Sequence, residues 1–390
     1  MRAIELGTAL VLVASSAQAI VQQKATEDPC QAANRALAEH RYETARLQYE
    51  TCLKQAAPSI ENLSNLGMAY AQLGQFDQAI KTYHQALALD PGNPALRMNL
   101  GLAYLKSGRT AEAKVEFART LMADLNNAKA QELLALCHYQ SKEFELAALE
   151  AERALSARPE EDSTAFLLGS AYLKLGLYRE AIPLLYGAAQ KTKSPETRLV
   201  LGEAFLGVKA YSSALKEFLA AEAASPETPG LHNDLGTAYA GLGQPDKAQA
   251  EFETQLAATP NDFEANYYLG RLKRLANDPE AAKQFLAKAD RGRPGDPSVA
   301  YEYASFAMQD KNYAKAEELL RGVLDKVPTY TDAHVLLAEA YYKLRRPDDA
   351  RREKAIAEAL GQAEQARVVA EGKAIEEAHR HQGPPGTPHP

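Results

Sequence analysis

Residues 60–93 read IENLSNLGMAYAQLGQFDQAIKTYHQALALDPGN, and the chain copies this stretch many times over. Gly67 and Tyr70 return as Gly101 and Tyr104, and the later copies keep the same spacing. A chain that repeats itself at a fixed interval stacks one supersecondary unit on the next. The sequence therefore predicts a solenoid and not a single globule.

Each copy carries small residues at two fixed positions. The period is 34 residues, with one step of 33 between Gly169 and Gly202. The first small position is Gly67, Gly101, Ala135, Gly169, Gly202, Gly236, Gly270, Ala304 and Ala338. The second is Ala79, Ala113, Ala147, Ala181, Ala214, Ala248, Ala282, Ala316 and Ala350. Apolar residues recur at helical spacing in each half, and a Pro such as Pro91 ends most copies because it cannot continue a helix. Each copy is thus predicted to be two helices joined by a short turn.

The two ends of the array differ from its middle. Residues 20–58 are predicted to form a linker and a degenerate first repeat that caps the array, and residues 59–350 form the regular array. Helical spacing of Ala continues beyond Ala350, so we expect a C-terminal capping helix over residues 351–382. The final residues 383–390, GPPGTPHP, are expected to form a disordered tail.

The first residues have the features of a secretory signal. Arg2 precedes an apolar stretch from Leu6 to Ala14, and Ala17-Gln18-Ala19 fits a small-x-small cleavage site. We expect residues 1–19 to be a signal peptide cleaved after Ala19, with the protein exported to the periplasm or secreted. An ordinary N-terminal helix is the alternative. No stretch reaches the roughly 20 apolar residues that a membrane-spanning helix needs.

Composition and motifs exclude several classes of function. A net charge of -7 argues against nucleic-acid binding, which needs a basic surface. The chain has no HExxH, P-loop or GxSxG motif, and the array leaves no room for a catalytic domain. The one His cluster, at His379, His381 and His389, has no Cys or carboxylate at ligand spacing. We therefore predict a protein that is not an enzyme and that has no cofactor and no metal.

The pattern resembles the tetratricopeptide repeat family, a helix-turn-helix repeat of 34 residues with the same small positions. The match covers about residues 26 to 360, with about nine to ten repeats. Departures are local: the Trp of the family's first helix is absent, and His138 and Lys273 replace the usual Tyr. The resemblance implies a right-handed superhelix whose first helices line a concave groove, and it implies protein partners.

Three sets of groove positions carry over from the family. Asn65 and Asn99 lie one repeat apart and are placed to bracket a peptide backbone, unless they are merely solvated. The second set, called here the apolar middle, consists of Leu133, Leu136, Phe166, Leu167, Leu173, Leu199, Val200 and Leu206. It suits an amphipathic helix or an extended apolar peptide, unless its side chains pack between repeats. The third set, the Tyr/Arg region, consists of Tyr267, Tyr268, Arg271, Arg274 and Tyr301. Tyr and Arg are enriched in binding hot spots, and Arg can receive a carboxylate, unless the Arg side chains are solvated at the surface and the Tyr side chains pack between repeats.

Cys30 and Cys52 fall on the two helices of the first repeat. Antiparallel helices bring such positions together, so the pair is a candidate disulfide that would staple the N-terminal cap, provided that the Cα atoms lie within about 7 Å. Cys137 falls in mid-helix and is expected to be a buried apolar residue.

These features predict a non-catalytic scaffold that binds peptide or helical segments of a partner protein in its groove. The alternative is an envelope assembly factor for polysaccharide or pilus export with a glycan-binding groove. The repeat positions hold the scaffold together, so they do not indicate which partner is bound or how many copies associate.

Overall fold

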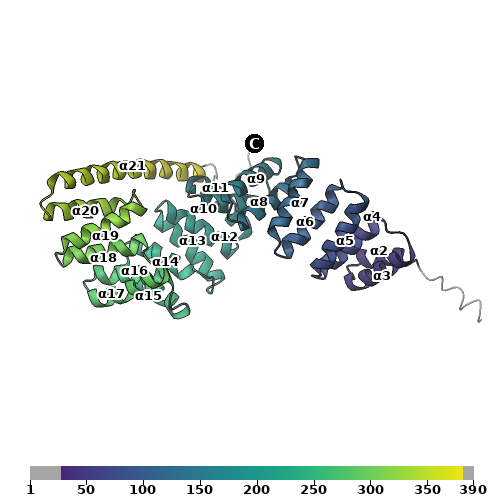
Figure 1. Ribbon diagram of the computed structural model, residues 1–390, viewed down its shortest axis with the longest axis horizontal. Helices are drawn as coiled ribbons and strands as arrows, with labels where there is room; N and C mark the ends of the chain where they lie inside the picture. Colours follow the sequence, from purple (N-terminus) through teal and green to yellow (C-terminus); the bar gives the residue numbers. More distant parts are fainter. Residues whose placement is uncertain (1–27, 381–390) are drawn as a thin grey trace, which may run out of the picture. The chain divides into compact units, whose positions relative to one another are not determined.

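Twenty helices, α2 to α21, make up residues 28–380, the part of the chain that the computed structural model describes. Successive helices pair, α2 with α3, α4 with α5 and so on, and within each of the two units described below each pair packs against the next (Figure 1). No strand occurs in this range. The predicted all-α solenoid is thereby confirmed. The predicted signal peptide, residues 1–19, and the predicted tail, residues 383–390, lie outside the described residues.

The chain divides into two compact units, Met1–Glu160 and Glu161–Pro390. The helices of unit 1 are α2 (Pro29–Ala38), α3 (Tyr42–Gln55), α4 (Ile60–Gln72), α5 (Phe76–Leu89), α6 (Pro94–Lys106), α7 (Thr110–Ala123), α8 (Ala128–Gln140) and α9 (Phe144–Ala157). Those of unit 2 are α10 (Asp162–Lys174), α11 (Tyr178–Thr192), α12 (Pro195–Gly207), α13 (Tyr211–Ala224), α14 (Leu231–Gly241), α15 (Pro245–Ala258), α16 (Phe263–Leu275), α17 (Pro279–Gly292), α18 (Pro297–Gln309), α19 (Tyr313–Lys326), α20 (Thr331–Lys343) and α21 (Pro347–Arg380).

The Gly of the first small position lets the two helices of a pair touch through a large side chain. A Cβ placed on Gly101 would lie 2.6 Å from the ring of Phe117, and one on Gly67 would lie 2.6 Å from the ring of Tyr83. Both rings are buried. Where Ala135 replaces the Gly, the residue sixteen positions later is the small Ala151. In this repeat the larger residue at the first position is matched by a smaller one at the second, because the volume between the helices is limited. Ala304 and Leu320 show that the match is not strict.

The turn between paired helices needs one residue in the left-handed region. Gly74 fills this place with φ of 73°, and Arg345 fills the equivalent place before α21 with φ of 61°. A non-Gly residue there is strained by roughly 1 kcal/mol. From the sequence, only the turns that contain Gly could be predicted. The turns that place a Lys, His, Asn or Arg in the left-handed region could not be recognised.

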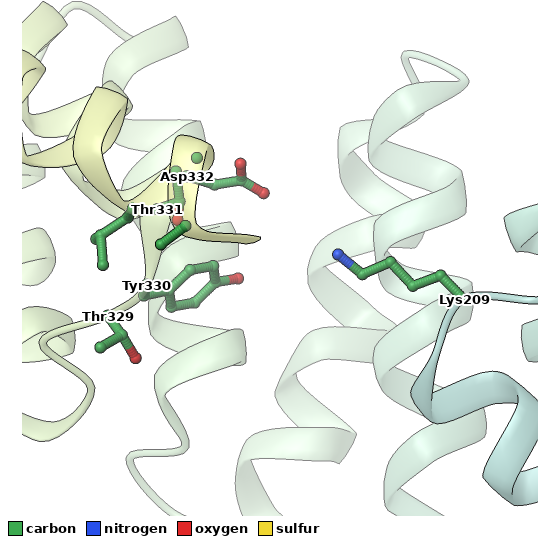
Figure 2. A pocket seen from close by; sticks show the side chains of 8 residues that line it. Lys209, Thr329, Tyr330, Thr331 and Asp332 are labelled. Carbon is green, nitrogen blue, oxygen red and sulfur yellow. The ribbon is translucent and has the colours of Figure 1, made fainter. Parts of the chain in front are cut away.

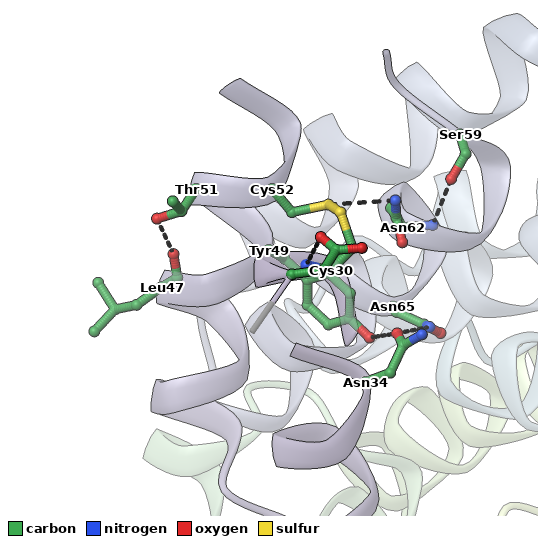
Figure 3. Close-up of a disulfide and its surroundings, with 10 residues drawn as sticks. Cys30, Asn34, Leu47, Tyr49, Thr51, Cys52, Ser59, Asn62 and Asn65 are labelled. Atoms are coloured by element: carbon green, nitrogen blue, oxygen red, sulfur yellow. Dashed lines mark hydrogen bonds between the residues drawn. A yellow bond between two sulfur atoms is a disulfide. The ribbon is translucent and has the colours of Figure 1, made fainter. Parts of the chain in front are cut away.

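The first helix pair is stapled by a disulfide (Figure 3). The sulfur atoms of Cys30, near the start of α2, and Cys52, in α3, are bonded, and the two Cα atoms lie 5.0 Å apart. Below this bond the hydroxyl of the buried Tyr49 donates to Asn34 Oδ1 at 2.5 Å. The atypical first pair, whose first helix is short, is therefore held by a covalent bond as well as by packing.

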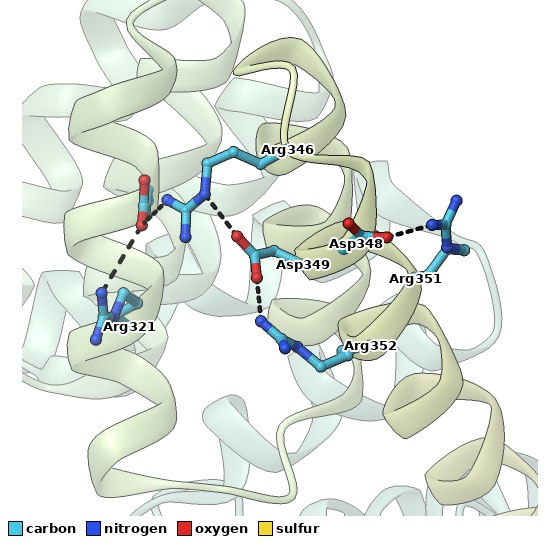
Figure 4. A network of polar contacts seen from close by, with 7 residues as sticks. Arg321, Arg346, Asp348, Asp349, Arg351 and Arg352 are labelled. Atoms are coloured by element: carbon cyan, nitrogen blue, oxygen red, sulfur yellow. Dashed lines mark hydrogen bonds and ion pairs between the residues drawn. The ribbon is translucent and has the colours of Figure 1, made fainter.

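The last helix, α21, is both the second helix of the final pair and the predicted cap, so the expected boundary at residue 351 falls inside one continuous helix. Its start is fixed by ion pairs (Figure 4). Arg346 donates to Glu317 of α19 at 2.8 Å and to Asp349 in the first turn of α21 at 2.6 Å. Beyond its contact with α20, α21 also contacts α11. Within residues 28–380, no helix has the length and apolar character that crossing a membrane requires.

Candidate partner-binding surface

The predicted Asn pair lies in unit 1 and gains a third member. Asn65 Nδ2 donates weakly to Asn34 Oδ1 at 3.5 Å (Figure 3). Asn34 precedes Ala36 by two residues, as Asn65 precedes Gly67, so it holds the equivalent place in α2. Asn99 is partly buried in α6. The sequence did not reveal Asn34, because the first repeat is three residues shorter there and the spacing of 31 hides the match.

The apolar middle is in good part packed interior. Leu133 belongs to the core of unit 1, and Leu167 and Leu173 are buried in unit 2. These three residues present little surface to a partner, which corrects the prediction that they line a groove. The members that remain partly buried are Leu136 in unit 1 and Phe166, Leu199, Val200 and Leu206 in unit 2. Apolarity alone does not distinguish a side chain that faces a groove from one that faces the next repeat.

The predicted Tyr/Arg region lies within unit 2 and contains a run of aromatic contacts. Tyr268 stacks on Phe252, with ring centroids 5.0 Å apart, and meets Tyr267 edge-on at 5.1 Å. Tyr301, in α18, stacks on Tyr330 at 5.2 Å. Tyr330, which the sequence did not single out, directly precedes α20. Phe252, in α15, is fully buried, so the partly exposed rings are the Tyr rings of α16, of α18 and of the residue before α20, which belong to three successive repeats.

The two Arg residues of this region have different roles. Arg274 is 15% exposed and donates to the carboxylate of Glu302, which is 1% exposed. This Arg is therefore committed to a buried ion pair, and the prediction that it receives a partner's carboxylate is corrected. Arg271 is 49% exposed, and its Nε lies 4.0 Å from the same carboxylate. Its guanidinium keeps donors available to solvent or to a ligand.

A pocket of about 630 Å³ lies beside Tyr330 (Figure 2). Tyr330 and Asp332, at the start of α20, face Lys209 of the α12–α13 turn across it. The complete lining is Lys209, Thr329, Tyr330, Thr331, Asp332, Leu360, Gly361 and Ala363, the last three from α21. Because Tyr330 also stacks on Tyr301, the pocket and the Tyr/Arg region form one continuous surface, called here the Tyr330 surface.

Burial raises the pKa of several side chains in this part of unit 2. It raises the pKa of Tyr267, Tyr301 and Tyr330, so these hydroxyls stay protonated and can donate hydrogen bonds. Asp234 occupies the place in α14 that Asn65 occupies in α4. Burial, followed by the nearby carboxylate of Glu203, raises the pKa of Asp234 to about 8.

Comparison with known proteins agrees with this architecture. Models of the tetratricopeptide repeat match residues 63–80, 73–137, 233–297, 273–325 and 307–371. A model described as anaphase-promoting complex, cyclosome, subunit 3 matches residues 145–221. Among solved structures, the crystal structure of the APC/C hetero-tetramer Cut9-Hcn1 superimposes with a TM-score of 0.50, at 15% identity, over 96% of this chain and 93% of that one. A likeness at such low identity supports the fold alone.

Two curated relatives match part of the sequence. Tetratricopeptide repeat protein 21B of Mus musculus is 29% identical over 125 residues, which are 30% of this chain and 9% of that protein. Tetratricopeptide repeat protein 21 homolog of Caenorhabditis briggsae is 23% identical over 194 residues, 48% of this chain and 14% of that protein. The chain thus spans a small part of the length of either relative. The repeat positions, the paired helices and the matching family models together show that this chain belongs to the tetratricopeptide repeat family.

Proposed function

We propose that the protein is a scaffold that binds an extended segment of a partner protein on the Tyr330 surface of unit 2. The observation that carries the proposal is the continuity, through Tyr330, between a row of Tyr rings and a pocket of about 630 Å³. Ligand pockets typically measure about 300–1,000 Å³, so this pocket has room for an anchoring side chain of a ligand. Tyr side chains add contact area at low cost in conformational entropy, which suits a surface of this kind.

Charge indicates which segment would be bound. Arg271 stands beside the Tyr rings with about half of its side chain exposed, and Glu302 already neutralises Arg274 below it. A carboxylate on the ligand would give Arg271 a second, better partner, since an Arg binds a carboxylate with two parallel hydrogen bonds. The proposed ligand is therefore a peptide with an aromatic or aliphatic anchor near an acidic residue.

The proposal includes the cellular compartment in which the protein is found. The Cys30–Cys52 disulfide supports export to the periplasm or to the outside, because disulfides persist in oxidising compartments and are rare in reducing ones. Thiol alkylation of the protein taken directly from its native cells tests this point. A fully reduced Cys30 and a protein that still carries residues 1–19 would contradict export.

Binding is tested with peptides selected from a random display library and measured by fluorescence anisotropy. Arg271→Ala is expected to lower the affinity for a selected acidic peptide by at least tenfold. Replacing the peptide's Glu by Gln should lower the affinity of the parent protein equally, and should not lower the affinity of Arg271→Ala further. Arg321→Ala is the matched control, because this Arg is 66% exposed on α19 and does not line the pocket. Equal effects of the two substitutions would refute the proposed site. Retention of purified envelope polysaccharide, but of no peptide, would support the assembly-factor alternative.

A further inference from the structure

A contact between a basic side chain, Arg or His, and a Glu recurs between the two helices of a repeat, and it always joins residues nineteen positions apart. Its four examples are Arg97–Glu116 at 2.8 Å, Arg198–Glu217 at 2.7 Å, His232–Glu251 at 2.8 Å and His334–Glu353 at 2.6 Å. Glu116 and Glu217 are buried, so the cation that faces them is a structural requirement. Arg and His occupy the same place, which shows that the packing accepts either side chain.

The third of these pairs has an additional neighbour, Glu222, near the end of α13. Glu222 lies eight residues after Ala214, and most repeats place a Leu at this distance from the second small position: Leu53, Leu87, Leu121, Leu155, Leu256 and Leu324. Packing of the repeat therefore favours an apolar side chain here, and a carboxylate is not needed for the fold. The pair His334–Glu353 has Leu324 at the equivalent place, so it has no such third group.

The side chains of Glu222, His232 and Glu251 converge. One ligand atom of each lies within 4.8 Å of the others, and all three residues are partly buried. They come from α13, α14 and α15, so they belong to two adjacent repeats. Among the residues whose side chains the structure describes, no Lys or Arg forms an ion pair with Glu222. Two carboxylates at this distance repel each other, and His232 Nδ1 forms a hydrogen bond with Glu251 at 2.8 Å. Burial and then the carboxylates of Glu251 and Glu222 raise the pKa of Tyr239, which agrees with both carboxylates facing the same region.

We propose that Glu222, His232 and Glu251 bind a zinc-like divalent transition-metal ion. One imidazole nitrogen and two carboxylate oxygens form a donor set that Zn²⁺ accepts, with water in the remaining position. Mg²⁺ and Ca²⁺ favour sites made of oxygen atoms alone, and they are expected to bind more weakly. A bound ion would link α13 to the α14–α15 pair and so hold two adjacent repeats together. Binding requires an unprotonated ring nitrogen, so affinity is expected to fall as the pH is lowered.

The repeat pattern itself supplies substitutions that keep the fold. Glu222→Leu installs the residue that six other repeats carry, and it removes one ligand. His232→Arg installs the residue found in the Arg198–Glu217 pair, so it keeps the ion pair while removing the nitrogen ligand. His334→Arg is the matched control in a pair without a third carboxylate. All variants are made in a full chain with Ala at residues 379, 381 and 389, so that the His residues there do not bind the metal.

The experiment titrates Zn²⁺ into metal-free protein in competition with a chromophoric chelator, with circular dichroism as the check on folding. One Zn²⁺ per chain is expected, with affinity at least tenfold lower in Glu222→Leu and in His232→Arg and unchanged in His334→Arg. Saturating Zn²⁺ should raise the thermal midpoint of the parent chain by a few degrees and leave that of Glu222→Leu unchanged. Absence of Zn²⁺ binding in the parent chain, or equal affinity in all folded variants, would overturn the proposal.

Discussion

Replacing Gly101 by Ala should destabilise the α6–α7 pair, although Ala is the better helix former. The new Cβ would lie 2.6 Å from Cε1 and 2.9 Å from Cδ1 of Phe117, a ring that is fully buried and has no room to move. Overpacking of this kind costs about 1–3 kcal/mol, and three ring atoms within 3.0 Å place this case in the upper half of that range. The helix propensity of Ala returns about 1 kcal/mol. The net loss is about 1–2 kcal/mol.

The sign of this effect should reverse when the ring is absent. Phe117→Ala alone costs about 3–5 kcal/mol through the cavity that it leaves. In that background Gly101→Ala meets no ring and should stabilise the pair by about 1 kcal/mol, since only the gain in helix propensity remains. The double variant has the same residue types as the natural Ala135 and Ala151 of the next repeat.

The opening free energies of α6 and α7 are best measured by hydrogen exchange, because a repeat array need not unfold in one step. Gly187→Ala is the control: a Cβ there meets nothing within 4 Å, so it should stabilise α11 by about 1 kcal/mol. If Gly101→Ala changes the opening free energy in the same direction with and without the Phe117 ring, close packing is not the reason for the Gly.

Three further outcomes are expected. The pKa of Asp234 is about 8 in the folded chain and near 4 in the unfolded chain, so between these values the folded chain holds a proton that the unfolded chain releases. The free energy of unfolding should therefore fall as the pH rises from about 4 to about 8. Asp234→Asn should remove this pH dependence in urea titrations at pH 5 and pH 8, and an unchanged pH dependence would contradict the assignment. Arg274→Ala leaves the buried carboxylate of Glu302 with only the more distant Arg271, whose Nε lies 4.0 Å away, and should cost up to about 3–5 kcal/mol. Arg271→Ala leaves the closer pair with Arg274 in place and should change the free energy of unfolding by less than about 1 kcal/mol, as two parallel denaturation curves would show. Cys52→Ser removes a disulfide with a sequence separation of 22 and should lower the stability of α2 and α3 by about 3 kcal/mol. This loss should appear as faster amide hydrogen exchange in those helices. Equal exchange with and without the disulfide would contradict its stabilising role.

Much of the fold was predictable from the sequence because the repeat positions act locally. Gly101 and Phe117 lie on paired helices joined by one short turn, so their spacing is constant and appears as a period. Asn34 was missed because a shorter first repeat shifts it out of that period.

The site was less predictable, because it depends on side chains that meet across repeats. Arg274 and Glu302 are 28 residues apart, and their contact depends on how two repeats stack. Leu167 and Leu173 are apolar and belong to a helix that the family resemblance places along a groove, yet they are buried. Tyr330 lies between helices, in a place that no repeat position describes.

The contact between α21 and α11 changes how unit 2 should unfold. In an open array each repeat touches only its neighbours, so stability is a sum of local terms and the ends can fray one repeat at a time. A contact between helices more than a hundred residues apart closes the array into a loop. Peeling from the C-terminal end must then first release α21 from α11, and forming that contact requires a loop closure that an open array does not need. Unit 2 should consequently unfold more cooperatively, and fold more slowly, than its number of repeats alone would suggest.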